Sequence, residues 1–154
     1  AGFLLTLRQT KSGTMSAERI LIDTSVWIEY FRGKSTGLVD YVGAIAKNRE
    51  ICVPRIVLAE LLQGAKSEKE LVVIEKFMDA FTILDQTDQT WLRAGKLSHE
   101  LKKKGKNVGL TDCYIAVIAQ DNKCAVLTLD QHFRDISRHT RLELIDADAV
   151  MHKK

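Results

Sequence analysis

The stretch Ile20-Leu21-Ile22-Asp23-Thr24-Ser25-Val26-Trp27 decides the fold. It opens with a short, apolar, β-branched run that ends at an acid, as a buried strand would. The next two residues, Thr24 and Ser25, are types that cap helices. The apolar side chains that follow have helical spacing up to Gly33, a residue type that commonly ends a helix. The stretch therefore predicts a strand, a turn and a helix, with Asp23 at the carboxyl end of the strand.

The same alternation continues along the chain. Further short strands are predicted at 51–53 (stopped by Pro54), 81–84, 125–128 and 142–145. The predicted helices are 38–46, 56–62, 67–78, 87–104, one capped by Thr111 that runs to about 120, and a short one that carries Phe133 and Ile136. Continuously apolar strands that alternate with helices indicate a parallel sheet covered on both faces. We predict an α/β fold with three layers, a central parallel sheet flanked by helices.

Length and composition favour one domain. A chain of 154 residues with 45% hydrophobic residues can build one core. We expect this domain to occupy residues 15–150, followed by a tail at 151–154. Residues 1–14 are interpreted as an expression remnant or an over-long start, because Met15 resembles a natural first residue. Their apolar stretch, residues 2–5, is too short to cross a membrane.

Charge and cysteine content exclude few partners but favour one kind of metal site. The formal charge of +3 is too small to indicate nucleic-acid or membrane binding by itself. The cysteines, Cys52, Cys113 and Cys124, are odd in number and lie in apolar runs, which indicates buried thiols in a reducing cytoplasm. No Cys-x-x-Cys motif or Cys/His cluster occurs in the sequence. Any metal would therefore be held by oxygen ligands.

Four carboxylates lie where such a site would form. Asp23 and Asp130 fall at or just beyond strand ends, where ligands collect in open parallel sheets. Asp112 lies in the first turn of a helix, and Glu60 lies in the middle of a helix among apolar residues. If the four meet, their repulsion raises at least one pKa unless a divalent cation lies between them. Oxygen ligands of this kind suit Mg²⁺, with Mn²⁺ as the second possibility.

Each of these acids also has an ordinary structural explanation. Asp23 could cap a turn, and Asp130 could cap the short helix that follows it. Asp112 could serve only the helix dipole, and Glu60 could lie on the solvent face of its helix. No single position is decisive, and the prediction of a metal site depends on the joint pattern.

That joint pattern resembles the PIN domain, in particular the VapC-type toxins of toxin–antitoxin pairs. The resemblance covers residues 19–146, and four segments carry it: 20–27, Pro54 with 58–64, 110–116, and 126–133. It implies that Asp23, Glu60 and Asp112 are the family's acidic trio and that Asp130 is its frequent fourth acid. Thr128 matches a hydroxyl that often precedes the fourth acid, where it would orient a water or a carboxylate. A β-branched residue that merely ends a strand is an equal alternative.

The resemblance also implies an activity and partners. It predicts a metal-dependent endoribonuclease that hydrolyses RNA to 5′-phosphate and 3′-hydroxyl ends. It predicts a VapB-like antitoxin that binds a groove formed by the early helices, and a homodimer. Trp27 and Phe31 form one helical stripe, and Val26 and Tyr30 form the adjacent one. We expect one stripe to be core and the other to be available for a partner.

The basic and histidine residues give weaker signals. His99, His132, His139 and His152 lie in polar surroundings, and we interpret each as a surface residue rather than a catalyst. The densest basic cluster, Lys102-Lys103-Lys104 with Lys106, could bind RNA phosphates. Lysines at a helix C-terminus before a glycine also complement the helix dipole, and this second interpretation is favoured.

Two other functions remain open at this point. The first is a PIN-like protein-binding module that acts mainly through an antitoxin complex in operon repression. The second is a phosphatase or phosphoacceptor domain with Asp23 as its nucleophile. The serine at position 25 disfavours the common hydrolase version, which has an aspartate there.

Overall fold

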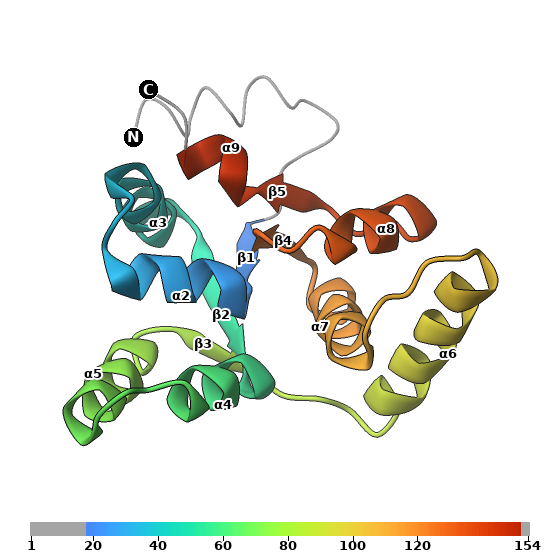
Figure 1. Ribbon diagram of the computed structural model, residues 1–154, viewed down its shortest axis with the longest axis horizontal. Helices are drawn as coiled ribbons and strands as arrows, with labels where there is room; N and C mark the ends of the chain where they lie inside the picture. The colour runs from blue at the N-terminus through green and yellow to red at the C-terminus, as the bar shows by residue number, and fades with distance from the viewer. Residues whose placement is uncertain (1–17, 152–154) are drawn as a thin grey trace.

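The computed structural model describes residues 18–151, so the expected leading segment 1–14 and tail residues 152–154 lie outside the described residues. Within that range, five parallel strands form one sheet in the order β3-β2-β1-β4-β5 (Figure 1). The strands are β1 (Arg19–Ile22), β2 (Glu50–Pro54), β3 (Thr82–Leu84), β4 (Cys124–Thr128) and β5 (Leu144–Asp146). The helices are α2 (Thr24–Arg32), α3 (Thr36–Asn48), α4 (Arg55–Gln63), α5 (Glu68–Met78), α6 (Thr90–Lys103), α7 (Leu110–Asp121), α8 (His132–His139) and α9 (Ala147–Met151).

Helices cover both faces of the sheet. Helix α3 packs on β2 and helix α7 packs on β4, and Figure 1 shows these helices on opposite sides of the strands. Ile20, Leu21 and Ile22 are fully buried, as are all five residues of β4 to within a few per cent. Burial on both faces explains why these strands are continuously apolar rather than alternating. The predicted three-layer α/β fold is confirmed.

The strand order creates one particular place for a site. The chain moves from β1 to β2 and β3 on one side of the sheet, and then returns to build β4 and β5 on the other side. Strands β1 and β4 therefore flank the point where the direction of winding reverses. In open parallel sheets, ligands bind at the carboxyl ends of such a strand pair. Asp23 and Asp130 follow these two ends.

Helix α2 packs residues of both aromatic stripes inward, so the stripes do not divide into one core stripe and one free stripe as expected. Val26 and Trp27 are both fully buried, and Tyr30 and Phe31 are half-buried. The ring centroid of Trp27 lies 5.7 Å from that of Phe77 in α5. The ring centroid of Phe77 also lies 5.4 Å from those of Tyr30 and Phe31, so α5 covers residues of both stripes.

Several local predictions were also wrong. Thr24 and Ser25 do not cap α2, since Asp23 occupies the cap position without a side-chain cap. Thr111 lies inside α7, which begins one residue earlier after Gly109. Strand β5 is shifted toward the C-terminus, at 144–146 instead of 142–145, and α9 follows it directly. Helix α9 was not predicted, and it extends from Ala147 to Met151.

The described part of the chain holds no helix that is both long and apolar enough to cross a membrane. Cys52, Cys113 and Cys124 are buried free thiols, as predicted.

Candidate metal centre

Asp23 is a buried and rigidly held carboxylate. Only 5% of it is exposed, at the carboxyl end of the central strand. Its Oδ2 accepts hydrogen bonds from Ser25 Oγ at 2.8 Å and from Thr128 Oγ1 at 2.9 Å. Burial raises the pKa of Asp23, and the hydrogen bonds from Ser25, Thr128 and the Thr24 backbone only partly oppose that rise. The protein therefore maintains a fixed acid in a place that disfavours its charge.

Strand β4 presents the second acid beside the first. Thr128 Oγ1 accepts a hydrogen bond from the Asp130 backbone N–H at 2.9 Å, while Leu129 N–H donates to Ser25 Oγ at 3.1 Å. These contacts bind the ends of β1 and β4 together. Asp130 Oδ1 also accepts the His132 backbone N–H at 2.9 Å, although the cap position of α8 is Gln131 and not Asp130, as the capping alternative supposed. Thr128 orients both acids, the role that the family resemblance implied.

Asp112 joins this pair from the first turn of α7. The potential ligand atoms of Asp112, Asp130 and His132 all lie within 4.8 Å of one another. His132 Nδ1 is 3.1 Å from Asp130 Oδ1 and 3.6 Å from Asp112 Oδ2. Burial, together with the charges of Asp130 and Asp23, raises the pKa of Asp112 to about 7, and His132 opposes this shift.

The donor set fits a hard divalent cation. The carboxylate oxygens suit Mg²⁺ or Mn²⁺, whereas the imidazole nitrogen of His132 is a ligand that transition metals prefer to Mg²⁺. Asp112 and Asp130 are half-buried and His132 is exposed, so the cluster is accessible to a substrate from one side. A cation there would offset the repulsion that raises the pKa of Asp112.

Glu60 lies at the rim of this cluster rather than within it. The side chain is exposed, as the solvent-face alternative supposed. Glu60 Oε1 nevertheless accepts a hydrogen bond from Thr24 Oγ1 at 2.9 Å, and Thr24 directly follows Asp23. The structure therefore brings Asp112 and Asp130 together with His132, places Asp23 near enough for its charge to act on Asp112, and leaves Glu60 at the rim beside Thr24.

The contact that His132 makes with these acids was not predicted from the sequence. His132 is a surface residue, as predicted, but its ring lies against two carboxylates. Its position two residues after Asp130, at the start of a short helix, was the available signal. His99 is exposed, His139 lies 2.8 Å from Lys104 Nζ through Nδ1, and His152 is outside the described residues.

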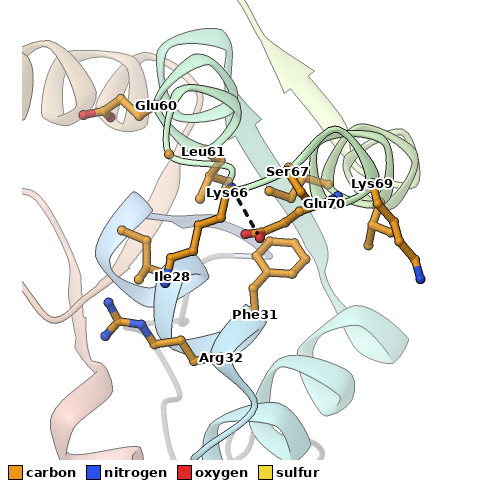
Figure 2. A pocket seen from close by; sticks show the side chains of 12 residues that line it. Ile28, Phe31, Arg32, Glu60, Leu61, Lys66, Ser67, Lys69 and Glu70 are labelled. Carbon is orange, nitrogen blue, oxygen red and sulfur yellow. Dashed lines mark hydrogen bonds between the residues drawn. The ribbon is translucent and has the colours of Figure 1, made fainter.

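A groove of about 620 Å³ runs between α2, α4 and α5 (Figure 2). Figure 2 shows Glu60 at one side of this groove and Lys69 at the other. The groove therefore begins next to the carboxylate cluster. Its apolar lining is Ile28, Phe31, Leu61, Val73 and Ile74, and its cations are Arg32, Lys66 and Lys69.

Known proteins share both the fold and the sequence pattern. The sequence model of the PIN domain matches residues 20–139. Ribonuclease VapC11 of Mycobacterium tuberculosis is 30% identical over 132 residues, which are 80% of this chain and 96% of that protein. The tRNA(fMet)-specific endonuclease VapC of Salmonella typhimurium is 26% identical over 132 residues, which are 83% of this chain and 97% of that protein.

Solved structures agree with these sequence relatives. DNA-bound VapBC from Salmonella typhimurium superimposes with a TM-score of 0.69 and 28% identity, covering 83% of this chain and 97% of that one. VapBC2 from Rickettsia felis, bound to a DNA fragment from its promoter, gives a TM-score of 0.70 at 24% identity, covering 82% and 97%. The second likeness is one of fold alone.

Proposed function

This chain belongs to the PIN domain family, and from that premise we propose that it is a metal-dependent endoribonuclease, the toxin of a toxin–antitoxin pair. The relatives named as VapC ribonucleases align with about four fifths of the chain and with nearly all of their own length. The match to the PIN domain spans residues 20–139, a range that includes all four acids.

The observation that carries this proposal is that Asp112 and Asp130 meet at the carboxyl end of β4, with Asp23 close enough for its charge to raise the pKa of Asp112 as well. We propose that these acids hold Mg²⁺, or alternatively Mn²⁺, with Glu60 contributing from the rim. When bound, the cation lowers the pKa of a water and neutralises charge on the phosphodiester. The protein's own contribution is to fix the carboxylates before the substrate arrives, through Thr128 and Ser25.

The groove beside the cluster supports a protein partner. Several solved neighbours are VapBC assemblies, and one is described as a toxin–antitoxin complex from Klebsiella pneumoniae. We propose that a VapB-like antitoxin lays an apolar segment between α2 and α5, against Ile28 and Val73. An occupant of the groove would reach Glu60 and so interfere with cleavage.

We also propose a homodimer that acts in the cytoplasm. The three free cysteines suit a reducing compartment. Trp91, Leu92 and Leu110 are large apolar side chains with 42%, 54% and 48% exposure, and none of them lines the groove. They offer a separate apolar surface for a second copy of the chain.

The test is cleavage of a labelled RNA panel by purified, antitoxin-free protein in Mg²⁺ or Mn²⁺, with EDTA as a control. Hydrolysis through an activated water should leave 5′-phosphate ends, which ligation to an adaptor detects. Cleavage that EDTA and Asp23→Asn both abolish is the expected result. Antitoxin binding without any metal-dependent cleavage would instead favour the binding-module alternative.

A further inference from the structure

The lysines after α6 lie next to the carboxylate cluster, along one face of α8. Lys106 Nζ is 3.9 Å from Asp135 Oδ1, and Lys104 Nζ is 2.8 Å from His139 Nδ1. Residues 132, 135 and 139 of a helix share a face, because their spacings of three and four residues correspond to about one turn. The same face of α8 therefore begins with His132 at the acids and continues past Asp135 to His139.

The backbone holds these lysines in place. Gly105, at a φ of 79°, ends α6 in the left-handed conformation. Lys106 N–H donates to Leu101 O at 2.9 Å and Gly105 N–H donates to Lys102 O at 3.0 Å, the two bonds of a Schellman motif. Ser98 Oγ then donates to Val108 O at 3.0 Å, so the segment that leads to Asp112 is anchored too. A fixed loop loses little conformational entropy when it binds a ligand.

The charge of this region is positive. Asp135 is the acid that Lys106 meets, and Arg138 Nη1 is also 3.9 Å from its Oδ1, so two cations share one carboxylate. Within residues 18–151, the side chains of Lys102 and Lys103 have no ion pair or hydrogen bond, and both are exposed. A lysine that only complements the dipole of α6 has no need to contact α8, as Lys104 and Lys106 do.

We propose that Lys104 and Lys106, supported by Lys102 and Lys103, form a phosphate-binding track for single-stranded RNA that leads away from the cleavage centre along α8. From His132 to His139 the helix rises about 10 Å. A stacked nucleic-acid strand advances roughly 3.4 Å per nucleotide. The far end of the track would therefore contact the RNA backbone about three nucleotides from the phosphate that is cleaved. This inference rests on the proposed function, because it needs RNA at the acids.

The test compares two double variants for RNA binding in EDTA, where the metal-dependent cleavage does not occur. Lys104→Gln/Lys106→Gln removes the track, and Lys47→Gln/Lys76→Gln is the matched control. Lys47 and Lys76 are exposed lysines in the last turns of α3 and α5, which Figure 1 shows at the opposite end of the molecule from α6 and α8.

We expect the track variant to bind a single-stranded RNA oligonucleotide roughly tenfold more weakly, with a salt slope smaller by about 1.4, for two lost phosphate contacts. The control should change neither quantity. If both variants lose RNA affinity equally, the track is overturned. It is also overturned if the track variant binds RNA as tightly as the wild type, even when its binding to the antitoxin is weakened. Cleavage by the wild type is measured separately. Binding through the track without cleavage would refute the nuclease but not the track.

Discussion

The hydroxyl of Thr128 donates a hydrogen bond of 2.9 Å to Oδ2 of Asp23, a residue 105 positions away in the sequence. The same hydroxyl accepts the backbone N–H of Asp130 at 2.9 Å. One side chain at the end of β4 therefore fixes a carboxylate at the end of β1 and the backbone of the next acid. Because Thr128 is itself 5% exposed, solvent competes little for these bonds.

Replacing Thr128 with valine should lower the rate of RNA cleavage by about 10- to 100-fold. The change keeps the shape of the side chain but removes both hydrogen bonds, and loss of a group that orients metal ligands has effects of this size. The measurement is single-turnover cleavage at saturating protein. Thr128→Ser retains the hydroxyl and should recover most of the rate. A valine variant that cleaves as fast as the wild type would show that Thr128 only ends the strand.

The pKa of Asp112 predicts how stability depends on pH without a divalent cation. Its folded pKa of about 7 exceeds the ordinary value of 3.8, so the folded state favours the protonated acid. The resulting stabilisation is fully present below pH 4 and is lost as the pH rises through 7. Asp112→Asn imitates the neutral acid. In EDTA, its stability advantage over the wild type should grow between pH 5 and pH 8, by on the order of 2 kcal/mol.

The check is chemical denaturation of both proteins at several pH values in EDTA. An advantage that does not change with pH, or one that shrinks, would contradict the crowding of Asp112 with Asp23 and Asp130. Adding Mn²⁺ at pH 7.5 should then stabilise the wild type, by about 2.7 kcal/mol when the metal is present at 100 times its Kd. Asp112→Asn should gain much less, since it lacks one ligand.

Glu60 tests whether the rim acid belongs to the centre. Glu60→Gln keeps an oxygen that can accept from Thr24 Oγ1, but it loses the charge. The side chain is exposed, so the free energy of unfolding should change by less than about 0.5 kcal/mol. Cleavage should fall at least tenfold, since removing a group from the shell around a metal typically costs about 10- to 100-fold. Glu75→Gln, at an exposed position of α5, is the control, and equal rates for the two variants would remove Glu60 from the site.

The groove between α2 and α5 can be tested with two adjacent valines. Val73 lines the groove and is 51% exposed, whereas Val72 is 46% exposed and does not line it. Val73→Asp should weaken antitoxin binding by about 2 kcal/mol or more, because it places a charge in a desolvated apolar contact. Val72→Asp should leave binding unchanged, and both variants should retain RNA cleavage. Calorimetric titration with the antitoxin measures the difference, and equal affinities would place the partner elsewhere.

The parts of the site that could be predicted from sequence were those set by short local patterns. Asp23 directly follows a fully apolar strand, and the parallel topology requires such strand ends to meet at one edge. Asp112 was predicted to lie in the first turn of its helix, and it does so in α7. The cysteine burial followed in the same way from the apolar runs.

The remaining features depend on packing between distant elements. The apolar residues of α4 do not reveal that Glu60 faces outward, because Leu58 and Leu62 are themselves only half-buried. The aromatic stripe of α2 could not be assigned to the core without the position of α5. Helix α9 has only one fully buried residue, Ala147, and therefore no apolar periodicity to detect. The contact of His132 with Asp112 joins two helices that are adjacent only in the folded chain.

The most direct test of the central claim is single-turnover RNA cleavage in Mg²⁺ by Asp112→Asn and by Asp121→Asn. Both replace an aspartate of α7, but Asp112 lies in the first turn beside Asp130, whereas Asp121 lies at the other end and pairs with Arg93. We predict that Asp112→Asn loses at least about 100-fold in rate while remaining folded, and that Asp121→Asn cleaves like the wild type. Equal rates for Asp112→Asn and the wild type would contradict a carboxylate-held metal as the source of activity.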